Sequence, residues 1–313
     1  MLNAMWEALS VGWGSLQQGL FERLVEPLVF ALGLGNRVEE AFNGTGWLLV
    51  GCLQLLVMLL VIAPLQRWRP AEPVRDRAAI RVDIVYTLIH RLGLFRIALF
   101  FSLDPLLDAL FAQMRGAGWP RLHLDALWPG VTDVAWVSLL LYLLVFDCVD
   151  YWMHRAQHRW QWWWQLHALH HSQTQMTMWS DSRNHLLDDV IRSAVIALVA
   201  QAIGVAPAQF VAIVAFTQLS ENLQHANLRL DFGRVGERLW VSPRFHRVHH
   251  SIDTGERNYG VLLPWWDMLF GTANFHSHYD PTGVRDAVAQ GRDYGRGFWS
   301  QQWRGLLRLA GRA

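Results

Sequence analysis

Long apolar segments, separated by short arginine-rich ones, dominate the first two thirds of the chain. The clearest runs from Trp47 to Leu65, close to the ~20 apolar residues that a membrane-crossing helix needs. Two further segments cover about residues 84–111 and 131–148. The segment at 84–111 contains His90, Arg91 and Arg96, so we expect it to lie partly at the membrane interface. The pattern predicts an all-α fold, an integral membrane helical bundle.

A fourth apolar segment, residues 190–219, is interrupted in its middle by Gly204-Val205-Ala206-Pro207. Glycine and proline at this spacing typically end a helix. A segment of about 30 residues is too short to cross a hydrocarbon core of about 30 Å twice. We therefore expect two half-length helices that enter the membrane and return. The alternative is a single full crossing, which would separate the histidines before the segment from those after it.

Arginines mark one end of the predicted spans. Five of them follow the first span, at positions 67, 69, 75, 77 and 81, and Arg155 and Arg159 follow the third. An excess of positive charge is typical of the cytoplasmic ends of membrane helices. We expect a multi-pass protein of the bacterial inner membrane in which these ends face the cytoplasm.

The C-terminal segment has the pattern of an amphipathic helix. Between Phe298 and Arg312, the side chains of Trp299, Trp303 and Leu306 fall on one side, and arginines recur at a spacing of four. Such a helix can lie in the membrane interface, and packing against the protein body is the alternative. We expect residues 1–130 to anchor the protein in the membrane and residues 276–313 to form an interfacial tail.

Composition excludes several classes of protein. Apolar residues make up 52% of the chain and charged residues only 17%, which argues against disorder. A net charge of +1 provides no general attraction for nucleic acid. The two cysteines, Cys52 and Cys148, lie in apolar segments and cannot form a disulfide framework or a thiolate metal site.

Histidine is the residue type that carries the candidate chemistry, because ten of the 14 histidines lie between residues 154 and 250. Residues three or four apart share one face of a helix. Each cluster can therefore offer two or three imidazoles to one side, and neutral imidazole binds Zn, Cu, Fe and Ni. The clusters are His154-x-x-x-His158, His167-x-x-His170-His171 and His246-x-x-His249-His250.

The number of histidines indicates two metal ions. The eight clustered rings, with His225 returning from the predicted hairpin, exceed what one tetrahedral zinc can bind. Two ions of higher coordination number fit better, and iron meets that demand. Ferritin-like sites need Glu-x-x-His pairs, which this sequence lacks. We expect His185 and Asp147 near the site, and Asp150 to accept a hydrogen bond from His154, four residues on. A simple interfacial carboxylate is the alternative for the two aspartates.

The motifs resemble the fatty acid hydroxylase/sterol desaturase superfamily over roughly residues 135–275. The resemblance rests on three histidine boxes in order, with matching flanks, and on a closing segment from Asn258-Tyr259-Gly260 to Phe270-Gly271-Thr272. The boxes are Asp147-x-x-Asp150-Tyr151-Trp152-x-His154-Arg155-x-x-His158, Trp164-x-x-His167-x-x-His170-His171-Ser172 and Ser242-Pro243-x-x-His246-x-x-His249-His250, with Arg183-x-His185 between the second and third.

The resemblance implies helical membrane anchors, a cytoplasmic helical cap that holds a di-iron site, and O2-dependent hydroxylation or desaturation of a lipid. Residues 131–275 would be the catalytic region. The implied ligands are His154, His158, His167, His170, His171, His225, His246, His249 and His250.

Oxidation of an aliphatic C–H bond also needs electrons from outside the chain, so we expect a ferredoxin- or cytochrome-type partner. One alternative is a histidine-rich membrane metal transporter or metal-binding protein. Another is a membrane cytochrome whose haem is held by two histidines. A haem of this kind needs two histidines in facing membrane spans. His90 is the histidine placed deepest in a predicted span.

Overall fold

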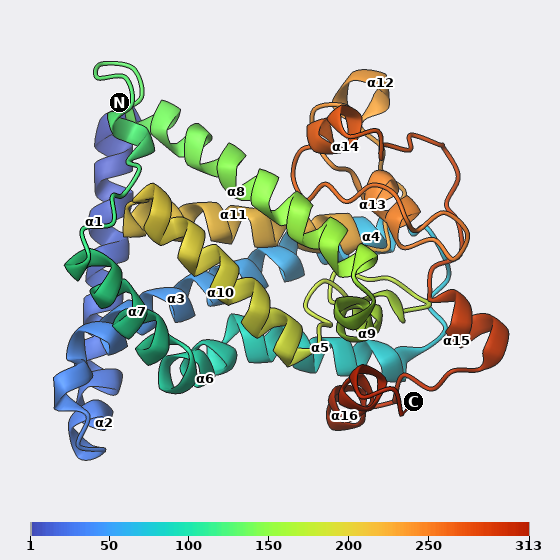
Figure 1. Ribbon diagram of the computed structural model, residues 1–313, viewed down its shortest axis with the longest axis horizontal. Helices are drawn as coiled ribbons and strands as arrows, with labels where there is room; N and C mark the ends of the chain where they lie inside the picture. The colour runs from blue at the N-terminus through green and yellow to red at the C-terminus, as the bar shows by residue number, and fades with distance from the viewer. Residues whose placement is uncertain (1, 313) are drawn as a thin grey trace.

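The computed structural model describes residues 2–312, with side chains from residue 10 onward. The described residues form helices and loops, with one isolated β-bridge between Ser251 and Thr282. Figure 1 shows two regions: long helices that run together on the left, and a cap of short helices and loops on the right. The all-α prediction is confirmed.

The first span is the most regular part of the membrane region. Helix α3 (Val38–Val57), the short π-helix η3 (Met58–Ile62) and α4 (Ala63–Trp68) continue one another. Together with η2 (Gly35–Arg37) they make an apolar helix of 34 residues, long enough to cross a membrane. Helices α1 (Leu2–Leu20) and α2 (Glu26–Ala31), joined by η1 (Phe21–Val25), run steeply across its far end (Figure 1).

Helix α8 (Ala135–Arg159) is the second candidate span and leads directly into the cap (Figure 1). A third span is possible if α5 (Arg77–Arg91) and α6 (Leu94–Ser102) act together, although they meet at an angle of 53°. Gly93 permits this bend because its φ of 77° is unfavourable for other residues. Helix α7 (Asp104–Gly116) then turns away, so the segment at 84–111 is divided among three helices.

The apolar segment at 190–219 forms a helical hairpin, as predicted. Helix α10 (Leu186–Ile203) ends at Gly204, whose φ is 68°, and α11 (Pro207–His225) returns to the cap. The single-crossing alternative is therefore wrong. The helices have 18 and 19 residues, more than the half-length expected, because polar residues at their cap ends continue both helices.

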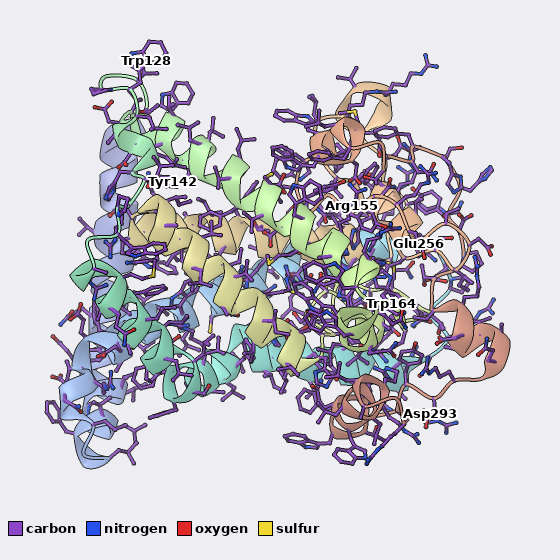
Figure 2. The ribbon with its side chains drawn as sticks, in the orientation of Figure 1. Trp128, Tyr142, Arg155, Trp164, Glu256 and Asp293 are labelled. Carbon is purple, nitrogen blue, oxygen red and sulfur yellow. The ribbon has the colours of Figure 1, made fainter. Side chains whose placement is uncertain are left out.

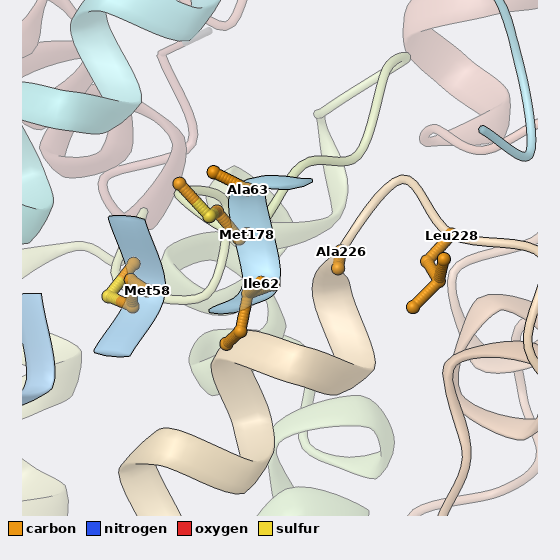
Figure 3. Packing of buried hydrophobic residues seen from close by; sticks show 6 residues of the cluster. All are labelled: Met58, Ile62, Ala63, Met178, Ala226 and Leu228. Carbon is orange, nitrogen blue, oxygen red and sulfur yellow. The ribbon is translucent and has the colours of Figure 1, made fainter. Parts of the chain in front are cut away.

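The cap contains six short helices. They are α9 (Gln161–His171), α12 (Gly233–Gly236), α13 (Pro243–His249), α14 (Trp265–Leu269), α15 (Arg285–Gln290) and α16 (Phe298–Leu309). Of these, α9 packs directly against α8, and α16 packs against α9. The last remaining element, η4 (Leu124–Ala126), lies in the loop before α8. Figure 3 shows how Met58 and Ile62 of the first span pack with Met178 and Ala226. This apolar cluster fixes the first span to the chain segments on either side of the hairpin.

Helix α16 packs on the cap through its polar face. Gln301, Gln302 and Arg308 are buried, and the Gln302 side chain donates to the Tyr86 hydroxyl and accepts from the Leu186 amide. Trp299 and Trp303 point outward, with 78% and 60% of their surface exposed. Packing on the protein body is thus confirmed for one face. A membrane-interface position for the tryptophan face stays a prediction, as do the domain limits at residues 130 and 275.

Candidate metal centre

Four helices supply the nine predicted ligands. Helix α8 carries His154 and His158 near its end, α9 carries the second box, α11 ends at His225, and α13 with its C-cap carries the third box. The helical spacing inferred from the sequence is thus present in the structure. Figure 2 shows the crowded junction of α8 and α9, where Arg155 and Trp164 are labelled. The Trp164 ring lies 4.9 Å from that of His158.

The structure brings all nine histidines together as two neighbouring groups. Within each group, one nitrogen of every ring lies within 4.8 Å of the others. Both groups draw on more than one box, and eight of the nine residues are buried. The rings of His171 and His250 stack at 4.3 Å and connect the groups. The five-membered group is His154, His158, His167, His171 and His249, and the four-membered group is His170, His225, His246 and His250.

Hydrogen bonds on the outer side of the centre fix the orientation of several rings. The Nδ1 atom of His154 donates to the Tyr259 carbonyl at 2.9 Å. His249 donates in the same way to the Arg257 carbonyl at 2.7 Å, and His225 to the Glu221 carbonyl at 2.8 Å. When Nδ1 carries the proton, Nε2 presents a lone pair on the opposite side of the ring. These bonds therefore aim lone pairs into the centre.

The arrangement of nitrogens fits bound cations. The Nε2 atom of His225 lies 3.1 Å from that of His170 and 3.0 Å from that of His246. The Nε2 atom of His167 is buried and has no hydrogen-bond partner within the described residues. Inward lone pairs at such distances repel one another unless protons or cations lie between them. An all-imidazole donor set suits ions such as iron, zinc or copper, so the residues fit a dimetal site.

Burial keeps the cap imidazoles neutral. It lowers the pKa of His249 to about 3. Burial also holds the pKa of each of His170, His171, His246 and His250 well below its usual value, and nearby histidines lower it further. A lowered pKa leaves the ring uncharged at neutral pH, and the uncharged ring is the form that binds metal.

The three residues expected near the site have different roles from those the sequence indicated. Asp150 faces Arg192 at 3.6 Å, and His154 uses the Tyr259 carbonyl, so the expected Asp150–His154 bond does not form. Asp147 accepts hydrogen bonds from the Leu262 amide at 2.7 Å and the Trp266 indole at 2.9 Å. It therefore fixes the closing segment against α8.

His185 lies outside both histidine groups and caps helix α10. Its Nδ1 accepts from the Leu187 amide at 3.1 Å, and its Nε2 donates to the Gln302 carbonyl at 2.9 Å. A Cβ atom on Gly305 would lie 2.2 Å from the His185 ring. Glycine at that position is what allows α16 to approach so closely.

Asp188 is the site residue that sequence reasoning missed. Its carboxylate accepts from His167 Nδ1 at 3.2 Å, from Trp163 at 2.6 Å and from Gln157 at 2.8 Å. The only signal in the sequence was an acidic residue three positions after His185. Because a carboxylate fixes the tautomer and raises the basicity of a metal-binding histidine, Asp188 supports the centre from α10.

Comparison with known proteins identifies the region that holds the site. Residues 139–272 match the fatty acid hydroxylase family. The ornithine lipid hydroxylase OlsE of Rhizobium tropici is 29% identical over 278 residues, which cover 86% of this chain and 80% of OlsE. An alkylglycerol monooxygenase of Danio rerio is 31% identical, over 49% of this chain and 33% of its own length.

A Delta(7)-sterol 5(6)-desaturase of Aspergillus fumigatus, erg3C, is 28% identical over 52% of this chain and 56% of its own length. No solved structure matches the chain. The matched region contains both histidine groups, and the spans before and within it are long and apolar enough to cross a membrane. The part of the chain that holds the candidate metal centre is therefore similar to the fatty acid hydroxylase family, and the relatives it resembles include lipid hydroxylases and a sterol desaturase.

Proposed function

We propose that the protein is an O2-dependent lipid hydroxylase whose nine histidines hold two iron ions. The observation that carries this proposal is the pair of adjacent, buried, all-imidazole groups. Bound iron would supply the redox chemistry that lets O2 attack an unactivated C–H bond. The buried position of the rings in the cap supports a fixed centre over the metal-transporter alternative, because transport sites usually lie within the bilayer.

The overall reaction defines what the protein must exchange with its surroundings. One oxygen atom enters a C–H bond, and the other leaves as water after uptake of two electrons and two protons. The electrons come from a ferredoxin- or cytochrome-type carrier on the cytoplasmic side. Arg69 and Arg75 lie at the cap end of the first span, which supports a cytoplasmic cap by the distribution of positive charge.

The unequal split of the rings indicates the reactive side of the centre. Five nitrogens nearly complete one coordination shell, and four leave more room for other ligands. A small chamber borders three of the four members of the smaller group, His170, His225 and His246, and only two of the five members of the larger one. The substrate and O2 therefore approach from this chamber, between α8, α10 and α11, while the Nδ1 hydrogen bonds hold the rings in place.

The substrate we propose is an aminolipid of the ornithine lipid type. The similarity to OlsE extends over 86% of this chain, whereas the similarities to the alkylglycerol monooxygenase and the sterol desaturase cover about half of it. The alignment with OlsE therefore includes much of the membrane region outside the matched family region.

Product analysis tests the proposal directly. Iron-loaded protein in nanodiscs is supplied with ornithine lipid, a reduced ferredoxin and isotopically labelled O2, and lipids are analysed by mass spectrometry. We expect a lipid that gains one labelled oxygen atom with the wild type and none with His170→Ala. Loss of two hydrogens without oxygen would instead identify a desaturase. Intact lipid despite full iron loading and electron supply would contradict the proposal.

A further inference from the structure

A chamber lined mainly by polar and charged residues adjoins the two histidine groups. It has a volume of about 30 Å³ and is lined by members of both groups and by Arg192, Glu221 and Gln224. Val261 is its one apolar lining residue. A space of this size holds about one water molecule. An apolar acyl chain has no suitable surface here, because its entry would remove polar and charged groups from their surroundings without replacing their partners.

Among the non-histidine residues that line the chamber, Gln224 has an acceptor atom without a hydrogen-bond partner in the described part of the chain. Gln224 donates to the Val261 carbonyl at 2.7 Å, and its Oε1 atom is buried without a partner among the described residues. The side-chain amide of Gln157 is already engaged by Asp188 at 2.8 Å. An unpartnered acceptor in a closed space favours an occupant that donates a hydrogen bond to it.

The charged side chains around the chamber also favour a cationic occupant. Asp181 is paired with Arg91 at 3.5 Å, and Arg192 faces Asp150 at 3.6 Å. Arg91 and Arg192 act on the carboxyl group of Glu221 only from beyond ion-pair distance, and this group has no ion pair or hydrogen bond in the part of the chain that the structure describes. A carboxylate turned into a small enclosed space is costly unless a cation joins it.

We propose that this chamber binds a primary ammonium group of the substrate, with Glu221 and Gln224 as its acceptors. The inference rests on the proposed function, since ornithine carries such an amine on its side chain. An ammonium group is about as large as a water molecule and has three N–H donors, so it matches both the volume and the open acceptors. The oxidised carbon then lies in the polar headgroup, within a few bonds of this nitrogen, and the acyl chains stay in the membrane.

Ligand binding by the iron-loaded protein under anaerobic conditions separates this idea from a role in folding or metal binding. The probes are an ornithine lipid and the same lipid with its amine acetylated, and the variants are Glu221→Gln and the surface control Glu256→Gln. We expect Glu221→Gln to raise the Kd for the free amine by about 10- to 100-fold, because a charge-assisted hydrogen bond is lost. Its Kd for the acetylated lipid and its iron content should match those of the control.

Three binding results would overturn the inference. The first is equal affinity of the wild type for the two lipids, and the second is an equal loss for both lipids in Glu221→Gln. The third is loss of iron from Glu221→Gln, because the carboxylate would then serve the metal centre.

Fragmentation of the oxidised lipid gives an independent test. Oxygen in the headgroup supports the inference, whereas oxygen in an acyl chain overturns it and leaves the proposed hydroxylase function intact. If no lipid is oxidised, the proposed function fails, and the binding comparison alone decides whether Glu221 recognises the amine.

Discussion

Two histidine-rich clusters in this protein have opposite character. Nine rings, eight of them buried, converge in the metal centre, and the inward Nε2 atom of His167 has no hydrogen-bond partner among the described residues. The cluster of His276, His278 and Asp280 lies on the cap surface, with 27% of the His276 side chain exposed. There, His276 already uses both nitrogens, one with Asp280 at 2.8 Å and one with the His278 amide at 3.3 Å. The surface cluster is satisfied without a metal, whereas the buried centre is not.

Removing one buried imidazole should have the largest effect. We expect His249→Ala to lose most of its bound metal and all measurable lipid oxidation, because a ligand and an inward lone pair disappear together. Metal analysis of the purified variant and lipid mass spectrometry measure both effects. Unchanged gel-filtration behaviour is the control for folding, and full metal content with full activity would refute the assigned centre.

The second largest effect concerns Asp188, whose carboxylate accepts a hydrogen bond from the predicted metal ligand His167. We expect Asp188→Asn to weaken metal affinity by about 10- to 100-fold, because the orientation and basicity of His167 depend on that carboxylate. Asp189→Asn is the matched control, since Asp189 follows on the same helix and instead contacts His90 at 3.0 Å. Competition with a chelator measures both affinities. Equal affinities of the two variants would show that Asp188 has no specific role.

A smaller effect is expected where α16 contacts His185. In Gly305→Ala the new Cβ would lie 2.2 Å from the His185 ring, so the ring or the helix must shift. Overpacking of this kind costs about 1–3 kcal/mol, which thermal unfolding in detergent can detect. Gly44→Ala on α3 is the control, because its Cβ would meet nothing within 4 Å. A variant at Gly305 as stable as this control would contradict the tight packing.

The smallest effect is expected at the surface cluster. The double variant with His276→Ala and His278→Ala should keep the wild-type metal content and lipid oxidation, because the His276 ring already has local partners and His278 is exposed to water. Metal analysis per chain is the measurement. A reproducible loss of one metal ion in the double variant would show that the surface cluster also binds metal, and it would contradict the contrast between the two clusters.

Local patterns in the sequence were sufficient for the elements that carry the site. Ligands three or four residues apart lie on common helix faces, and Gly204 and Pro207 divide the fourth apolar segment into a hairpin. Asp150 shows that spacing within one helix does not predict which partner a side chain finds on another helix. Spacing four placed it beside His154 on one helix, but Arg192 from another helix offers a full positive charge, and the aspartate faces that charge instead.

The sequence by itself determined the helices, the candidate spans and the set of nine histidines, because apolar length and helical periodicity are local properties of the chain. Only the tertiary structure decided that the rings divide into five and four across the boxes. It also decided that the polar face of α16 is buried and its tryptophans exposed. The physical reason is that ring grouping and face burial depend on how separate helices cross and pack, and periodicity within one helix carries no information about its neighbours.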